Sequence, residues 1–312
     1  MGDHREAIKL GLVGIGKIAR DSHVPAIEAD ARFALIATAS RHAGLAGVPG
    51  HRDIAAMLAA HPEIAAVSLC TPPQGRFEIA MTAIEACRHV MLEKPPAATL
   101  TEAQALAAAA RAAGVTLFAS WHSREAAGVA AARRWCARGP LRQVRIDWRE
   151  DIRHWHPGQE WILAAGGFGV FDPGINALSI LTAILPDPVT LTGARLDFPE
   201  GRDAPIAADL TMASAGVPIA AGFDFLQTGA QTWTIAVEAD HGTLVLADGG
   251  SRLAIDGAAV APDASAGEYP RLYARFADLV AAGESDADFA PLALCADAFL
   301  VGERRTVAPF TF

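Results

Sequence analysis

A glycine-rich turn near the start of the chain constrains the fold more than any other feature. Residues 9–13 have the composition of a short buried strand, and Gly14, Ile15 and Gly16 follow directly, ahead of a helical stretch over 17–29. Gly14 permits a tight turn, Gly16 lets backbone approach a pyrophosphate, and a small residue at 19 lets the helix pack close to the sheet. Helix-terminal amides favour an anion there.

This turn predicts a dinucleotide-binding unit, because it follows a strand and opens a helix. The alternative is a turn with a structural role alone. If the unit binds a dinucleotide, its phosphates should lie against Gly14, Gly16, Lys17 and Ile18.

The residues up to about 120 alternate short strand-like runs with alanine-rich helical stretches. The expected strands are 9–13, 33–39, 65–70, 89–92 and 116–119, and the expected helices are 17–29, 53–60, 75–86 and 101–113. Asp53 and either Thr99 or Thr101 are suitable N-caps, and Gly114 should end the fourth helix. The pattern is typical of a parallel sheet covered on both faces, and it predicts a doubly wound Rossmann domain over residues 1–122.

The texture changes after about residue 138. A glycine-rich helix start at 166–169 is followed by strand-like runs at 189–196, 207–212, 218–225 and 232–238. We therefore expect an α+β domain over residues 123–312, with a large, mostly antiparallel open sheet, and an α/β protein overall. The stretches 270–282 and 292–305 look helical, and both are expected to pack back onto the first domain.

Composition excludes several classes of protein. The chain has 312 residues, of which 52% are hydrophobic and 20% charged, so it can bury a large core. A net charge of −9 opposes binding to nucleic acid. No apolar run approaches the roughly 20 residues of a membrane span, and the start lacks a signal-peptide layout, so we expect a cytoplasmic protein. The four cysteines contain no Cys-x-x-Cys pair and are expected to be reduced thiols.

A lysine ends the fourth expected strand. The run from Val90 to Leu92 leads into Glu93, Lys94, Pro95 and Pro96, and the preceding strand leads into Thr71, Pro72 and Pro73. Carboxyl ends of neighbouring parallel strands form the ligand crevice of such a sheet. We therefore expect Thr71, Pro72 and Glu93 to contact the cofactor and Lys94 to reach the nicotinamide, with Glu93 positioning Lys94 or closing the pocket.

The end of the second expected strand indicates which cofactor is bound. Where an NAD-selective site carries an acid for the ribose hydroxyl, this chain has Ser40 and Arg41. An arginine with a hydroxyl suits a 2′-phosphate, so NADP should be preferred and NAD accepted. The alternative is that Arg41 is a solvated loop cation.

Asp172 and Asn176 stand four residues apart in the glycine-rich helix start of the second domain. This spacing places both side chains on one helical face. The alternative for Asp172 is an N-cap without a part in chemistry.

These motifs together resemble the Gfo/Idh/MocA oxidoreductases, and within them the bacterial aldose 1-dehydrogenases that oxidise L-arabinose and D-galactose with NAD(P). The resemblance extends over 14–21, 67–70, 89–96, 121–123, 153–159, 166–179, 268–272 and 297–300. Most members of the family have a histidine where this chain has Asn176, whereas the aldose subgroup shares the Asp–Asn pair. The resemblance implies a Rossmann domain followed by a domain whose open sheet often forms a subunit interface, hence a monomer or a homodimer through that sheet.

The resemblance also implies a reaction. A pyranose would lose the C1 hydrogen as hydride to the nicotinamide and its C1 hydroxyl proton to a side chain, giving an aldonolactone. Lys94 would stabilise the developing negative charge, Asp172 would accept or relay the proton, and Asn176 would orient the hydroxyl. Either Lys94 or Asp172 is the base. The expectation requires Lys94 and Asp172 to meet at one sugar carbon.

Four further side chains are expected to complete the sugar pocket. His122 would bond a sugar hydroxyl or the cofactor carboxamide, Trp155 and Trp233 would offer apolar faces to the sugar ring, and His156 would add a polar contact. A structural role is the alternative for each histidine. His154 and His156 alternate, which on a strand would place both on one face, but no third ligand is evident and no metal is expected. The other candidate functions are a dehydrogenase for an inositol- or glucose-type substrate and a non-catalytic NADP-binding sugar sensor.

Overall fold

The computed structural model describes residues 6–261 and 266–312, and the chain forms two compact units. The first unit comprises residues 6–122 and 266–289, and the second comprises residues 123–261 and 290–312. A segment from near the end of the chain therefore completes the first unit.

The first unit is built on a parallel sheet. Its strands, within the described ranges, are β1 (Ile8–Val13), β2 (Phe33–Ala39), β3 (Gly50–His51), β4 (Ala66–Leu69), β5 (His89–Leu92) and β6 (Leu117–Ala119). Their order across the sheet is β3-β2-β1-β4-β5-β6, and every neighbouring pair is parallel. This is the order of a dinucleotide-binding Rossmann fold, whose ligand crevice opens at the carboxyl ends of β1 and β4, where the order reverses. The predicted fold class is confirmed for this unit.

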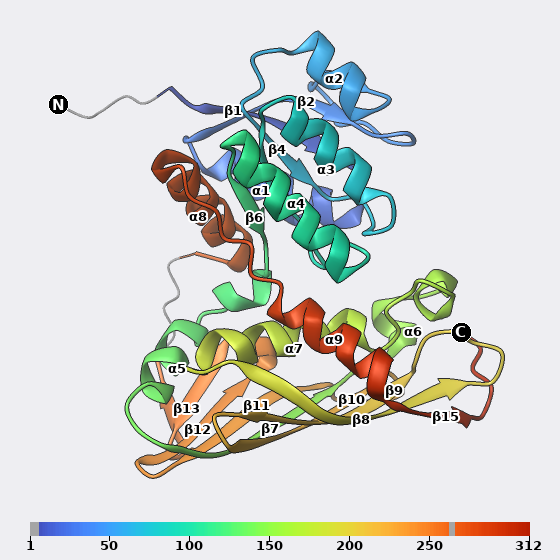
Figure 1. The fold of residues 1–312 in the computed structure, drawn as a ribbon, viewed down its shortest axis with the longest axis vertical. Helices are drawn as coiled ribbons and strands as arrows, with labels where there is room; N and C mark the ends of the chain where they lie inside the picture. The colour runs from blue at the N-terminus through green and yellow to red at the C-terminus, as the bar shows by residue number, and fades with distance from the viewer. Residues whose placement is uncertain (1–5, 262–265) are drawn as a thin grey trace. The chain divides into compact units, whose positions relative to one another are not determined.

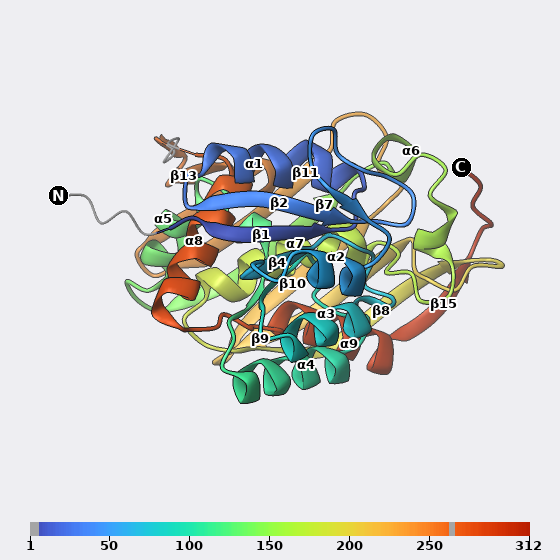
Figure 2. The ribbon, with the colours of Figure 1, turned by 90° about the horizontal axis from the view of Figure 1, so that it is seen from above.

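Helices cover both faces of this sheet (Figures 1 and 2). They are α1 (Val24–Ala29), α2 (Ile54–Ala60), α3 (Arg76–Glu85), α4 (Leu100–Ala113) and α8 (Glu268–Ala282). Side chains of α1 and α8 pack with one set of strand residues, and those of α2, α3 and α4 pack with the other. The expected packing of residues 270–282 on the first sheet is thus observed.

Local signals placed several helix ends correctly. The Asp53 carboxylate accepts a hydrogen bond from the amide of Ala56 at 2.9 Å, and the Thr99 hydroxyl accepts one from the amide of Glu102 at 3.1 Å. Gly114 ends α4 in the left-handed conformation. The helix predicted over 17–29 is helical over those residues, with a π-helical turn over Ala19–His23 before α1.

The second unit is built on a mostly antiparallel sheet. Its described strands are β7 (Leu141–Arg149), β8 (Val189–Pro199), β9 (Ala207–Ser214), β10 (Val217–Asp224), β11 (Thr232–Ala239), β12 (Gly242–Ala247), β13 (Arg252–Ile255), β14 (Ala258–Val260) and β15 (Glu303–Val307). The order is β14-β13-β12-β11-β7-β10-β9-β8-β15, and the pairs β7–β10 and β8–β15 are parallel. The predicted large, mostly antiparallel sheet is confirmed.

Helices of this unit lie over one face of the sheet (Figure 1). They are α5 (Val129–Cys136), α6 (Ile152–Trp155), α7 (Phe171–Ile184) and α9 (Ala290–Val301), with short 3-10 turns at His122–Glu125, Glu160–Leu163 and Asp248–Gly250. Along β7 the buried Val144, Ile146 and Trp148 alternate with charged residues, so the opposite face carries the charges. No helix among the described residues has the length and hydropathy needed to cross a bilayer.

The predicted helix over 292–305 is wrong at its end and in its packing. Helix α9 stops at Val301 and packs with α7 and β8 of the second unit, not on the first sheet. A Cβ atom at Gly302 would lie 2.4 Å from the carbonyl oxygen of Ala298, so glycine is required where the chain leaves the helix. Residues Glu303–Val307 then pair in parallel with β8.

Candidate active site

The glycine turn has the geometry that a dinucleotide requires. Gly14 has φ = +89°, and a Cβ atom there would lie 2.8 Å from the backbone nitrogen of Thr71. At Gly16, no heavy atom lies within 4 Å of the position that a Cβ atom would take, which leaves the backbone approachable. Lys17 and Ile18 are exposed beside the turn, and Ala19 is fully buried. The described residues therefore fit a pyrophosphate at this turn.

The end of β2 is the position at which a Rossmann fold distinguishes its cofactors. Ser40 follows β2 and its amide donates to the carbonyl of His51 at 2.9 Å, which ties the loop to the end of β3. Arg41 is exposed. An exposed guanidinium beside a serine hydroxyl can bind a 2′-phosphate, and the loop carries no acid at 40 or 41.

Lys94 is the one side chain that the turn after β5 presents to the surface. From Val90 to Ala97, every residue except Lys94 is buried. The turn therefore holds Lys94 by its neighbours on both sides, at the carboxyl end of the sheet where ligands bind. At the end of the adjacent strand β4, Thr71 is partly exposed and Pro72 is exposed.

Glu93 points into the interior and binds protein groups. One carboxylate oxygen accepts the amide hydrogen of Lys94 at 2.5 Å, and the other accepts from the Tyr269 hydroxyl at 2.5 Å and lies 3.2 Å from Nε2 of His23. Nδ1 of His23 in turn lies 2.8 Å from the hydroxyl of Tyr273. This geometry favours the positioning role for Glu93, because the residue is only 4% exposed.

The electrostatics of this cluster follow from burial and pairing. Burial would raise the pKa of Glu93, but the hydrogen bond and charge of His23 and the Tyr269 hydroxyl lower it to about 2. Burial lowers the pKa of His23, but Cys70, Tyr273 and Glu93 together raise it above its ordinary value. Both shifts favour the imidazolium–carboxylate form of the pair.

Glu93→Gln should lower stability in a pH-dependent way. The folded-state pKa of Glu93 is below its ordinary value of 4.5, so its contribution is complete above about pH 4.5 and is lost as the pH falls toward about 2. We expect the melting temperature of the variant to lie below that of the parent at pH 7, and the gap to narrow as the pH falls from about 4.5 to 3. Differential scanning calorimetry from pH 7 to pH 3 measures this, with exposed Glu78→Gln as the matched control. A gap that stays constant with pH contradicts the assignment.

His122 ends the first unit beside the same cluster. Its Nδ1 lies 2.6 Å from a carboxylate oxygen of Glu268, and its ring stacks on Tyr269 with centroids 5.6 Å apart. The side chain is 19% exposed, so one edge remains accessible. Glu268 and Tyr269 hold its orientation, which is compatible with the expected contact to sugar or carboxamide.

In the second unit, α7 presents Asp172 and Asn176 together. From Phe171 to Leu181, these two are the residues that are not buried. The helical spacing prediction is therefore observed. Val170 is the N-cap of α7 and Asp172 lies in its first turn, so the alternative interpretation of Asp172 as the N-cap is wrong. The preceding chain is fixed by the amide of Val170, which donates to the carbonyl of Pro205 at 2.7 Å.

A group of polar and aromatic side chains surrounds Asp172 within the second unit. Nε2 of His156 lies 3.7 Å from carboxylate oxygens of both Asp172 and Glu150. Glu150 is 5% exposed and accepts a hydrogen bond from the indole N–H of Trp233 at 2.9 Å. The Trp233 and Trp155 rings are 5.3 Å apart and meet edge to face. The structure thus brings together four of the predicted residues of this unit, and Asn176 lies on the same face of α7 as Asp172.

The segment that holds His154 and His156 is not a strand. Residues 152–155 form the short helix α6, so His154 and His156 do not share a strand face. The Asp151 carboxylate caps α6 by accepting from the amide of Arg153 at 2.9 Å, and this local bond outweighs the alternation of the sequence. The described part of the chain holds no group of three potential metal ligands.

Sequence reasoning missed His23, Tyr269, Arg76 and Glu150. All four are buried or partly buried. His23 and Tyr269 contact Glu93 across 70 and 176 residues of chain, whereas Arg76 and Glu150 lie within a few residues of Thr71 and His156, which they contact. The one available signal was Glu150 itself, an acid directly after a strand and close to Trp155 and His156 in sequence.

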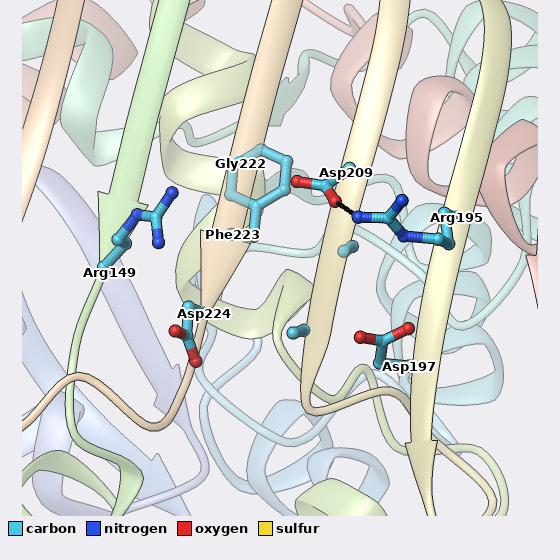
Figure 3. Close-up of a pocket in the computed structure, with 9 residues that line it drawn as sticks. Arg149, Arg195, Asp197, Asp209, Gly222, Phe223 and Asp224 are labelled. Atoms are coloured by element: carbon cyan, nitrogen blue, oxygen red, sulfur yellow. Dashed lines mark hydrogen bonds and ion pairs between the residues drawn. The ribbon is translucent and has the colours of Figure 1, made fainter. Parts of the chain in front are cut away.

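A separate hollow lies on the uncovered face of the second sheet (Figure 3). Its lining includes Arg149, Arg195, Asp197, Asp209 and Asp224. Arg195 is ion-paired with Asp209, and Arg149 approaches Asp147 at 3.4 Å. Asp197 is paired with Arg305, and the Asp224 carboxylate accepts from the amide of Leu226 at 2.7 Å. None of the predicted site residues lines the hollow.

Comparison with known proteins places the chain among oxidoreductases. Residues 8–120 match the model of the oxidoreductase family with an NAD-binding Rossmann fold. The chain is 43% identical to galactose 1-dehydrogenase of Pseudomonas fluorescens over 98% of its own length and 99% of that protein. The crystal structure of D-galactose-1-dehydrogenase from Rhizobium etli covers 100% of both chains at 53% identity, with a TM-score of 0.96. A 3-ketoreductase from Actinomadura kijaniata, solved with NADP, shares the fold at 20% identity and a TM-score of 0.82.

Proposed function

The chain belongs to the Gfo/Idh/MocA family of oxidoreductases, and from this premise we propose that it oxidises the anomeric carbon of D-galactose and L-arabinose with NADP or NAD. The observation that carries the proposal is the full-length similarity to two galactose 1-dehydrogenases. It is supported by the exposure pattern, because Lys94, Asp172 and Asn176 are the partly exposed side chains of otherwise buried segments.

The proposed reaction converts an aldopyranose and NADP⁺ into an aldonolactone, NADPH and a proton. The bound nicotinamide supplies the acceptor for the C1 hydrogen, which leaves with its electron pair. The C1 hydroxyl loses its proton to a protein side chain as the C1–O bond becomes a carbonyl. Lys94 stabilises the negative charge that develops on this oxygen, and Asp172 accepts or relays the proton. Asn176 orients the hydroxyl by hydrogen bonding.

The remaining predicted residues bind and orient the sugar in this proposal. Trp155 and Trp233 offer indole faces, and Trp155 is 46% exposed. His156 lies between Asp172 and Glu150 and contributes a polar contact that those carboxylates orient. His122 bonds a sugar hydroxyl or the cofactor carboxamide. Gly14, Gly16, Lys17, Ile18, Ser40, Arg41, Thr71 and Pro72 bind the cofactor.

A panel of four sugars tests the proposal. Galactose and glucose differ only in configuration at C4, as do L-arabinose and D-xylose, and each pair differs from the other by the hydroxymethyl group. Initial rates with NADP and with NAD should favour galactose and arabinose. Deuterium at C1 of galactose should slow turnover and appear in the reduced cofactor. Preference for glucose, or turnover of an inositol assayed beside the panel, would support another sugar or polyol dehydrogenase. Tight cofactor binding without turnover of any sugar would support the sensor.

Arg41→Ala should shift cofactor preference toward NAD. Loss of a charge-assisted contact to the 2′-phosphate is expected to raise the KM for NADP by about tenfold or more, with little change for NAD. Initial-rate kinetics with both cofactors measure the ratio. Exposed Arg111→Ala, on α4, is the control and should leave the ratio unchanged. An unchanged ratio in Arg41→Ala would identify Arg41 as the solvated loop cation.

The uncovered face of the second sheet is the surface through which we propose that two copies pair, if the protein is not a monomer. Arg145 with Asp147 and Arg305 with Asp197 form ion pairs on β7 and between β15 and β8. Alternating charges of both signs allow one such face to complement another. Sedimentation velocity distinguishes the monomer from the dimer.

The protein is expected to act in the cytoplasm.

A further inference from the structure

Arg76 is a buried cation whose hydrogen bonds all go to main-chain carbonyls. It begins α3 and is 2% exposed. Its guanidinium donates to the carbonyl of Thr71 through Nε, at 3.1 Å, and through Nη2. Nη1 donates to the carbonyls of Glu93 and Pro95. One side chain therefore ties the turn after β4 to the turn after β5.

Two of these carbonyls belong to the residues that flank Lys94. Glu93 and Pro95 are the residues on either side of it, and the Nη1 group bonds both. The backbone amide of Lys94 donates a hydrogen bond to the carboxylate of Glu93. The backbone of Lys94 is thus held at its amide and at both neighbouring carbonyls, while its side chain reaches the surface.

Burying the Arg76 guanidinium has a desolvation cost, so packing alone does not explain why a cation occupies this position. Burial lowers the pKa of Arg76 to about 10, against the opposing charge of Glu93, so the guanidinium remains charged at neutral pH. An apolar side chain of similar volume would avoid the desolvation cost of a buried ion. Such a side chain cannot donate to carbonyls of two separate turns, which the planar guanidinium does.

We propose that Arg76 is a positioning residue for Lys94, fixing the turn that carries the amine by hydrogen bonds to the carbonyls of Thr71, Glu93 and Pro95. Because Arg76 is buried, it acts through this backbone and not by contact with substrate. The expected effect on kcat rests on the proposed function, whereas the expected effect on the position of the Lys94 side chain does not.

The chain offers a direct probe of the structural consequence. Lys9, Lys17 and Lys94 are its only lysines among 26 basic residues. Reductive methylation with ¹³C-formaldehyde therefore gives three lysine signals and that of the amino terminus in a carbon–proton correlation spectrum. Lys94→Met assigns the signal of position 94. In Arg76→Ala we expect this signal to shift or broaden, and those of Lys9 and Lys17 to stay in place. The same is expected in Arg76→Lys, where the introduced lysine can add one further signal that is absent from the parent spectrum.

The kinetic consequence is a loss in kcat without a matching change in KM. A small displacement of a catalytic group costs about 10²-fold in rate. We expect Arg76→Lys and Arg76→Ala to lower kcat by roughly this factor while the KM for galactose changes little. Millimolar guanidinium chloride should restore part of the rate to Arg76→Ala, and sodium chloride of equal ionic strength should not. Arg88→Ala, half-buried at the opposite end of β5, is the control.

The outcomes separate the two proposals. A parent enzyme that oxidises galactose, with Arg76→Lys at the parent kcat and an unmoved Lys94 signal, overturns the positioning role. A parent that oxidises none of the sugars overturns the proposed function, and a displaced Lys94 signal in the same variants would still support the role of Arg76. If Arg76→Ala fails to fold, Arg76→Lys keeps the charge and nearly the volume and carries both measurements.

Discussion

Lys94→Met is expected to lower kcat for galactose by about 10³-fold, the largest effect of any single substitution here. A positioned group that moves a proton contributes about 10² to 10⁴ in rate, and one that stabilises developing charge contributes about 10² to 10³. Initial-rate kinetics at saturating cofactor measure the loss. Lys9→Met, on β1, is the matched control and should behave as the parent. Turnover near the parent value in Lys94→Met would remove the lysine from the chemistry.

Lys94→Arg separates the two roles that remain open for this side chain. Arginine keeps the positive charge but does not lose its proton in proteins. If Lys94 acts by stabilising charge, the arginine variant should retain part of the rate that methionine loses. If Lys94 is the base, both variants should be equally impaired, and the pH profile of kcat in each should lack the ionisation that Lys94 contributes in the parent.

Asp172→Asn is expected to lower kcat by about 10² to 10³-fold with little change in the KM for galactose. The substitution keeps the shape and removes the proton acceptor, which acts mainly in the transition state. Exposed Asp297→Asn, on α9 of the same unit, is the matched control. A change in thermal stability without loss of kcat would contradict the catalytic role. Asp172 would then only stabilise α7, as a negative charge near the N-terminus of the helix.

The double variant Lys94→Met with Asp172→Asn tests whether the two residues act on one carbon. Residues that serve a single step lose less together than the product of their separate losses, whereas independent residues multiply. We therefore expect the double variant to be little slower than the slower single variant. Losses that multiply fully would contradict the central premise of the proposed mechanism.

Much of the first unit could be predicted from local patterns. The strands Phe33–Ala39 and His89–Leu92 occur at the predicted residues, because buried parallel strands are continuous apolar runs bounded by turns. Asp53, Thr99 and Gly114 mark helix ends through bonds to backbone within a few residues. Gly14 requires a positive φ that other residues adopt rarely. Each of these signals is complete within a short window of sequence.

Errors arose where a distant partner or a competing local bond decided the outcome. On a strand, the alternation of His154 and His156 would have placed both on one face, but the Asp151 cap made a helical turn. The apolar stretch before Arg305 predicted a longer helix, but close packing at Gly302 and pairing with β8 turned its last residues into a strand. The pattern of residues at 154–156 does not include Asp151, and the apolar pattern before Arg305 does not include β8.

The sequence by itself determined which residues are candidates for the proposed chemistry: a lysine after β5, an acid and an amide one helical turn apart, and a glycine turn for a dinucleotide. Only the tertiary structure decided what holds them, since Glu93 meets His23 and Tyr269 across 70 and 176 residues of chain. Arg76 likewise reaches the turns at Thr71 and Pro95 because α3 packs beside both strand ends. The physical reason is that a side chain's type can be read at its own position, whereas its partners depend on which distant segments the packed core brings together.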